Sequence, residues 1–101
     1  MRVFLMLLIC YLIGSIPCGY LIGRRNRVDL RRHGSGNIGA TNAFRILGPE
    51  VGLLVLFCDA AKGFIPVLIV NNIFGPLWGV GAGLAAIVGH NWSVFLGFRG
   101  G

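Results

Sequence analysis

The residues best suited to chemistry lie in one glycine-rich, basic stretch, residues 31–45 (RRHGSGNIGATNAFR). Its glycines let the backbone turn, and its hydroxyl and amide groups supply hydrogen-bond donors. Flanking guanidinium groups can each donate two parallel hydrogen bonds to a phosphate. The donors are Ser35, Asn37, Thr41 and Asn42, set among Gly34, Gly36 and Gly39 and flanked by Arg31, Arg32 and Arg45. The pattern predicts a phosphate-binding loop; the alternative is a basic turn that only orients neighbouring membrane helices.

The composition indicates a membrane protein. Of 101 residues, 55% are hydrophobic and 12% are charged, which is too apolar for a soluble domain of this size. A net charge of +6 would suggest nucleic acid in a soluble chain, but six of the nine basic residues lie between Arg24 and Arg45, between two apolar segments. The positive-inside rule explains them as a cytoplasmic loop. Because no aromatic platform accompanies them, we expect no nucleic-acid partner.

Three apolar segments are each long enough to cross a hydrocarbon core of about 30 Å as a helix. We expect helices at 3–22, 51–70 and 77–96, joined by a cytoplasmic loop at 23–50 and a short outer turn at 71–76. This is the pattern of a single-domain, all-α, polytopic integral membrane protein. A cleaved signal peptide is the alternative for the first segment, but no A-x-A-like site follows it. Pro17 should kink the first helix, and small residues at four-residue spacing should form packing seams in the first and third (Ser15, Gly19, Gly23; Gly75, Gly79, Gly83).

Two charges interrupt the second predicted helix. Asp59 and Lys62 lie three residues apart and therefore on one face. A charge at bilayer depth costs a few kcal/mol unless it is paired or solvated, so we expect either a structural ion pair or a polar pocket. His90 falls at the cytoplasmic end of the third helix, as a candidate acid–base group or an interfacial anchor. The order of spans brings the glycine-rich loop and residues 90–101 to the same, cytoplasmic membrane face.

Two other motifs are discounted. Gly34, Gly36 and Gly39 spell G-x-G-x-x-G with Asp59 twenty residues later, but a dinucleotide site needs a buried strand before the motif, and RRNRVDLRRH stands there. The cysteines lie within apolar segments without ligand spacing, which predicts neither a disulfide framework nor a zinc site.

Four motifs in order resemble one family. They are YLIGSIPCGYLIG (11–23), GSGNIGATNAFR (34–45), DAAKG (59–63) and GHNWSVFLGFRGG (89–101). Together they closely resemble the bacterial acyl-phosphate:glycerol-3-phosphate acyltransferases, integral membrane enzymes of phospholipid synthesis. Members of that family are about twice as long, so the resemblance implies the N-terminal half of an enzyme. It also implies that residues 97–101 begin a second phosphate loop, which in the family continues into a lysine.

The resemblance implies a reaction and its site. The primary hydroxyl of glycerol 3-phosphate attacks a fatty acyl phosphate, giving lysophosphatidic acid and inorganic phosphate without a metal or cofactor. The other expected partner is the lipid bilayer. The implied location is the bacterial inner membrane, multi-pass, with the active face cytoplasmic. We expect this half alone to be inactive.

The implied site residues come from four parts of the sequence. Ser35 and Arg45 match the family's essential serine and arginine. Two proton acceptors are candidates: the side chain of His90, and the phosphate of the acyl donor itself. The expected phosphate-binding residues are Gly34, Ser35, Gly36, Asn37, Thr41, Asn42, Arg45, Lys62, Gly100 and Gly101, with Asp59 pairing Lys62 in a polar pocket. The alternative function is a small transporter or channel subunit for an anionic solute.

Overall fold

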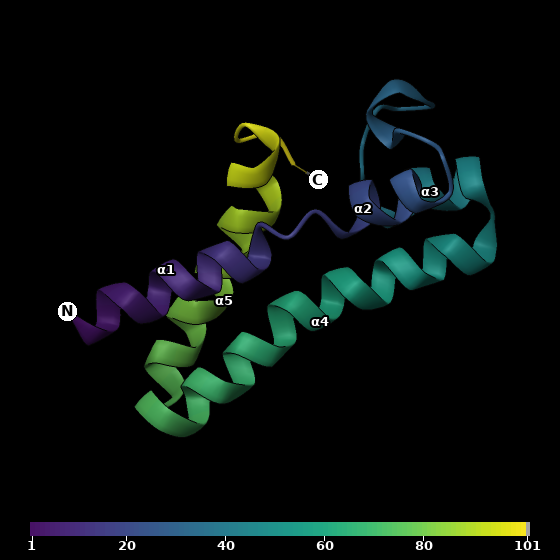
Figure 1. Cartoon of the computed structure of the whole chain (residues 1–101). Coiled ribbons are helices and arrows are strands. Elements are labelled where there is room, and N and C mark those ends of the chain that lie inside the picture. Colours follow the sequence, from purple (N-terminus) through teal and green to yellow (C-terminus); the bar gives the residue numbers. More distant parts are fainter. Residues whose placement is uncertain (101) are drawn as a thin grey trace.

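Every regular element in the computed structural model, which describes residues 1–100, is helical. The long helix α4 (Pro49–Phe74) forms the base of the molecule, as Figure 1 shows. The helices α1 (Arg2–Gly14) and α5 (Pro76–Asn91) pack on each other and on α4 near one end. The shorter α2 (Cys18–Arg25) and α3 (Ala40–Leu47) pack on the other half of α4. Two single-turn 3₁₀ helices, η1 (Leu30–Arg32) and η2 (Val94–Leu96), complete the described chain.

Three segments are long and apolar enough to cross a membrane: Arg2–Arg25, Pro49–Phe74 and Pro76–Leu96. The predicted all-α membrane architecture is therefore confirmed. Large apolar side chains cover the outside of these helices, with Phe57 71% exposed and Phe64 64% exposed. A surface of this kind suits lipid rather than water.

The first predicted helix, 3–22, is divided in two. α1 ends at Gly14 and α2 begins at Cys18, so the expectation of one kinked helix is corrected. Pro17 has no N–H to donate and disfavours helical geometry in the residue before it. The backbone therefore leaves the helix at Ser15–Pro17, and Figure 1 shows the extended link between α1 and α2.

The predicted loop at 23–50 contains more regular structure than expected. α2 continues to Arg25, η1 follows, and α3 occupies Ala40–Leu47 before α4 begins at Pro49. The helix α3 buries Ala43 against Leu30, Ile38 and Val55. α3 has only eight residues between two glycines, which is too short for an apolar repeat that would predict a helix from the sequence. Its helix is therefore stabilised by this packing rather than by its own sequence pattern.

The predicted turn at 71–76 is almost entirely helical. α4 runs on to Phe74, and Gly75, with φ of +97°, is the single residue that links it to α5. A positive φ costs glycine little, and Pro76 at the first position of α5 is pre-set for a helix. The third predicted helix, 77–96, is α5 followed by the separate turn η2.

Small residues allow the spans to pack closely. A Cβ atom on Gly14 would overlap the backbone of Ala86, and one on Gly89 would overlap the backbone of Tyr11 and Ser15, so α1 and α5 are in backbone contact. Gly79 and Gly83 face α4, as predicted, whereas Gly75, the third residue of the predicted seam, links α4 to α5 and would place a Cβ atom in open space. A small apolar cluster lies where α1, α4 and α5 meet, formed by Met6, Cys10, Val70 and Ala82.

Candidate functional site

The buried side chain of Asn42 organises the glycine-rich loop. Its Nδ2 donates to the carbonyl oxygens of Leu30, His33 and Asn37 at 3.3, 3.0 and 2.8 Å. Its Oδ1 accepts from the N–H of Ser35 at 3.2 Å. The amide is thus used within the protein and shapes the loop, while the contact of Asn42 with phosphate stays a prediction.

The loop ends in an uncapped helix N-terminus. Gly39 is the N-cap of α3 and offers no side chain to the first N–H groups of the helix, which have no acceptor within it. A cavity of about 180 Å³ lies there, lined by Ser35, Asn37, Gly39, Ala40, Thr41 and Asn42. Free N–H groups and the positive end of a helix dipole attract an anion, and two hydroxyls stand beside them.

The turns of the loop depend on glycine and on local hydrogen bonds. Gly34 and Gly36 adopt φ of +54° and +78°, which other residues rarely adopt. The Oδ1 of Asn37 accepts from the N–H of Gly39 at 2.7 Å, and the Oγ of Ser35 accepts from the N–H of Asn37 at 3.3 Å. The hydroxyl hydrogen of Ser35 remains free to be donated to a ligand.

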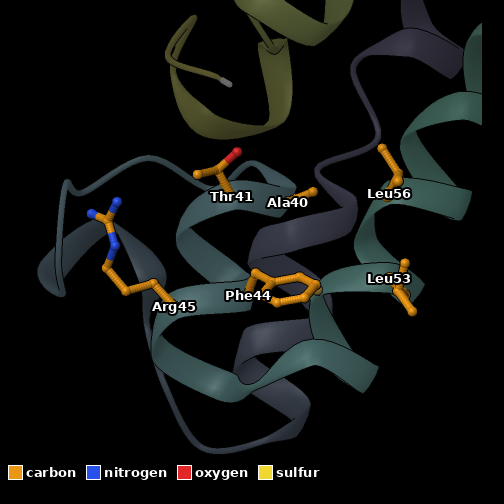
Figure 2. A pocket seen from close by; sticks show the side chains of 7 residues that line it. Ala40, Thr41, Phe44, Arg45, Leu53 and Leu56 are labelled. Atoms are coloured by element: carbon orange, nitrogen blue, oxygen red, sulfur yellow. The ribbon is translucent and has the colours of Figure 1, made fainter.

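A groove between α3 and α4 adjoins this cavity. It has a volume of about 450 Å³ and shares Ala40 and Thr41 with the cavity. Figure 2 shows Thr41 and Arg45 of α3 on one side of Phe44 and Leu53 and Leu56 of α4 on the other. One side of the groove is therefore polar and cationic and the other apolar, which suits an anionic group attached to a hydrocarbon chain.

Arg31 is held in a fixed position at the edge of the loop. Its Nε and Nη2 donate to the two carboxylate oxygens of Asp29, each at 3.0 Å, and its guanidinium lies 4.5 Å from the ring centroid of Tyr20. The hydrogen bonds from Arg31 lower the pKa of Asp29 to about 2, and Asp29 in turn raises the pKa of Arg31. Both groups are therefore charged at neutral pH. Asp29 was not among the residues predicted for the site, although an acidic residue two positions before an arginine was a usable signal.

A third cavity, of about 230 Å³, joins the loop to the C-terminal segment. It is lined by Arg31, Gly36 and Ile38 from the loop side and by Leu96, Arg99 and Gly100 from the other. The convergence predicted from the order of the spans is present, and Figure 1 shows the C-terminal end turning toward α2 and α3. Arg99 was missed as a candidate, although it directly precedes the glycine pair. Gly101 lies outside the described residues.

The charged residues of α4 lie deeper, among the helices. Lys62 Nζ is 2.9 Å from Asp59 Oδ1, which confirms the predicted pairing on one face, and it also donates to the carbonyl oxygen of Ile16 at 3.0 Å. His90 Nδ1 lies 3.9 Å from Asp59 Oδ1. These three residues line a mainly apolar cavity of about 270 Å³ between α4 and α5. The structure thus groups Lys62 and His90 with Asp59, and Ser35 and Arg45 with the loop and α3.

Fold and surface together define a polytopic membrane protein with a basic, donor-rich loop at one end of its helices. Its family follows from comparison with known proteins: residues 4–101 match the family model of glycerol-3-phosphate acyltransferase, and the chain belongs to that family.

Curated relatives and solved structures agree with this assignment. The chain is 53% identical over 98 residues to glycerol-3-phosphate acyltransferase 2 of Moorella thermoacetica, covering 96% of the chain and 50% of the relative. It is 49% identical over 94 residues to the glycerol-3-phosphate acyltransferase of Geobacter sulfurreducens, covering 92% and 48%. The chain spans about half the length of the curated relatives that it matches.

The fold matches a crystal structure of PlsY (YgiH), an integral membrane glycerol 3-phosphate acyltransferase, in its glycerol 3-phosphate form. The TM-score is 0.93 at 46% identity, covering 100% of this chain and 52% of that one. The lysophosphatidic acid form matches with a TM-score of 0.91 at 44% identity, covering 100% and 50%.

Proposed function

We propose that the natural gene product transfers a fatty acyl group from an acyl phosphate to the 1-hydroxyl of sn-glycerol 3-phosphate, giving lysophosphatidic acid and inorganic phosphate. The observation that carries this proposal is the uncapped N-terminus of α3, where free N–H groups and the hydroxyls of Ser35 and Thr41 open into an amphipathic groove. Family membership supports it, as do the relatives named glycerol-3-phosphate acyltransferases.

One phosphate binds at the start of α3 in this proposal. The backbone N–H groups and the hydroxyls of Ser35 and Thr41 donate to its oxygens, and Arg45, one turn along from Thr41, supplies the positive charge. An attached acyl chain would lie against Phe44, Leu53 and Leu56, where burial of each CH₂ contributes about 0.8 kcal/mol.

The cavity between the loop and the C-terminal segment suits the phosphate of the other substrate. Arg31 and Arg99 flank it, and Gly36 and Gly100 bring backbone close to its interior. Because both substrates carry a phosphate, two adjacent anion sites on either side of residues 36–39 would hold the hydroxyl of one substrate near the carbonyl of the other.

The proposed reaction needs few protein groups. The hydroxyl oxygen forms a bond to the acyl carbonyl carbon, and the bond from that carbon to the phosphate oxygen then breaks. The arginines and N–H groups of the site stabilise the negative charge that develops on the carbonyl oxygen. We assign the hydroxyl proton to the departing phosphate, because His90 lies beside Asp59 among the helices.

The proposed location is the bacterial inner membrane with the loop facing the cytoplasm. The cationic residues between Arg24 and Arg45 follow the first span, as the positive-inside rule requires of a cytoplasmic loop. Glycerol 3-phosphate is a cytosolic metabolite and would reach the loop directly from that side.

The test uses membranes from cells that express the natural gene product. With radiolabelled glycerol 3-phosphate and palmitoyl phosphate we expect labelled lysophosphatidic acid and one phosphate released per product; palmitoyl coenzyme A in place of palmitoyl phosphate should give none. Absence of product with palmitoyl phosphate contradicts the proposal. Uptake of glycerol 3-phosphate into sealed vesicles, driven by an ion gradient, would favour a transporter instead.

A further inference from the structure

The break between α1 and α2 lies deep in the first span, where backbone carbonyl groups need donors from the protein. Pro17 has no N–H, and carbonyl groups without donors cost several kcal/mol in hydrocarbon. The carbonyl of Ser15 accepts from the hydroxyl of Ser93. The carbonyl of Ile16 accepts from the N–H of Cys18 at 2.9 Å and from Lys62 Nζ at 3.0 Å. Side chains from two other parts of the chain thus donate hydrogen bonds to the carbonyl groups at the break.

Lys62 is well placed for this task. It is the only lysine in the sequence, and its side chain is 7% exposed. Asp59 Oδ1 lies 2.9 Å from Lys62 Nζ and neutralises its charge. The ammonium group has three N–H donors, and a second one donates to the carbonyl oxygen of Ile16. A buried, paired cation that donates to a carbonyl fixes the distance between α4 and the start of α2.

The helix α2 in turn supports the phosphate loop. A Cβ atom on Gly19 would overlap the carbonyl of Ile38, so the first turn of α2 is in direct contact with the loop backbone. The ring of Tyr20 lies under the guanidinium of Arg31, and the N–H of Val28 donates to the carbonyl of Gly23 at 2.9 Å. Moving α2 would therefore move Ile38 and Arg31, two of the residues that line the cavity between the loop and the C-terminal segment.

We infer that Lys62 is a positioning residue: by holding the Ile16 carbonyl it fixes α2 against α4, and through α2 it holds the glycine-rich loop ready for phosphate. The inference deepens the proposed acyltransferase function and rests on it for its kinetic consequences. It replaces the sequence-based expectation that Lys62 contacts phosphate directly.

The two roles differ in what they predict for the empty protein. A positioning lysine orders the loop before any substrate binds, so its removal loosens residues 30–39 in the absence of ligand. A direct phosphate ligand leaves the empty loop unchanged and acts only when phosphate is present. Amide hydrogen exchange of the detergent-solubilised natural gene product, without substrate, separates the two roles.

Three variants test the inference. Lys62→Met removes the donor and the charge at similar length. Asp59→Asn combined with Lys62→Met restores charge balance, so it keeps the test open if the single variant fails to fold. Lys62→Arg keeps both charge and donors. Arg25→Met, at an exposed position in the last turn of α2, is the matched control for loss of one cation.

We expect exchange in residues 30–39 to rise about tenfold in Lys62→Met and in the double variant, and to return toward the wild-type rate in Lys62→Arg. The KM for glycerol 3-phosphate should rise about tenfold in the double variant with kcat changed less than about threefold. Arg25→Met should match the wild type in both measurements.

Each other outcome is decisive. A raised KM with unchanged exchange in the empty double variant assigns Lys62 to the phosphate and overturns the inference. Wild-type exchange and kinetics in the double variant also overturn it, because charge balance alone would then account for the effect of Lys62→Met. If the wild-type protein forms no lysophosphatidic acid, the proposed function fails, and the exchange experiment still decides the role of Lys62.

Discussion

The amide of Asn42 makes four hydrogen bonds at once, and the shape of the loop depends on them. Asn42→Asp keeps the acceptor for the N–H of Ser35 but removes the donors to three carbonyl groups. Because a buried unsatisfied polar group costs about 1–3 kcal/mol, we expect both Asn42→Asp and Asn42→Ala to lower the free energy of unfolding by about 3 kcal/mol. Unfolding in detergent, followed by circular dichroism, measures this.

Asn26→Ala is the control for Asn42, because it removes one exposed hydrogen bond, from Asn26 Nδ2 to the carbonyl of Ile22. It should change the free energy of unfolding by less than about 1 kcal/mol. Equal effects at positions 26 and 42 would show that the loop does not depend on the buried amide.

Ser35 and Arg45 are exposed, in contrast to Asn42, and have functional groups free for a ligand. Ser35→Ala and Arg45→Ala should each lower kcat/KM for palmitoyl phosphate, whose phosphate is proposed to bind at the start of α3, by on the order of 100-fold, the loss expected when a charge-assisted hydrogen bond is removed. Their amounts in the membrane and their thermal unfolding should remain those of the wild type. Arg24→Ala, at an exposed position in α2, is the control and should keep wild-type turnover; turnover near wild type in Ser35→Ala or Arg45→Ala would refute the assignment of that residue.

The pair Asp29–Arg31 gives the loop a defined pH dependence. Arg31 lowers the pKa of Asp29 from its ordinary value of 3.8 to about 2. The folded-state pKa is the lower one, so the carboxylate stabilises the folded loop above pH 3.8, and this contribution disappears as the pH falls through 2. A carbon-13 NMR titration of the Asp29 carboxyl should show a midpoint near pH 2, which Arg31→Gln raises toward 3.8 and Arg32→Gln changes far less. A wild-type midpoint near 3.8 would mean that the pair does not form.

At this scale the sequence predicted residue types better than roles. Asn37, Thr41 and Asn42 have equivalent donors in the sequence, yet the structure buries Asn42 and exposes Thr41. The difference depends on the carbonyl groups of Leu30 and His33, which only the folded loop brings to Asn42. Spacing along a chain cannot give such partners.

Among the elements, the three spans were predicted because hydropathy and length determine what crosses a bilayer. The break in the first span was not predicted, and neither was the helix α3, because both depend on tertiary contacts. Donors from Lys62 and Ser93 stabilise the break, and packing on α4 stabilises α3. Local sequence pattern carries neither contribution.

The backbone contact between α1 and α5 makes a prediction for glycine substitutions. Gly89 faces Tyr11 and Ser15 with no room for a Cβ atom, whereas nothing lies within 4 Å of a Cβ atom at Gly63 in α4. Gly89→Ala should separate the helices and lower the free energy of unfolding by about 2 kcal/mol or more. Gly63→Ala should leave stability unchanged or raise it by up to about 1 kcal/mol through helix propensity. Thermal unfolding of the two variants in one detergent compares them, and similar losses in both would contradict the close contact.

For the molecule as a whole, the fold places the loop and the C-terminal segment together and the α4–α5 link, at Gly75, near the opposite end of α4 (Figure 1). The two ends of the bundle differ in charge: six of the nine basic residues, from Arg24 to Arg45, lie at the loop end, whereas residues 71–76 carry no charge and α1 begins with the single cation Arg2. This asymmetry favours one orientation in the membrane, with the loop end in the cytoplasm.

Orientation can be measured with two single cysteines placed at the opposite ends. Cys10, Cys18 and Cys58 are free in the described structure, so a background in which all three are alanine avoids competing labels. In that background Arg32→Cys and Asn72→Cys put thiols at exposed positions beside the loop and near the α4–α5 link. In intact cells a membrane-impermeant maleimide should label position 72 and spare position 32, and in inside-out vesicles the preference should reverse. Labelling of position 32 from outside would place the loop away from cytosolic glycerol 3-phosphate, and the proposed reaction could not then draw on that substrate.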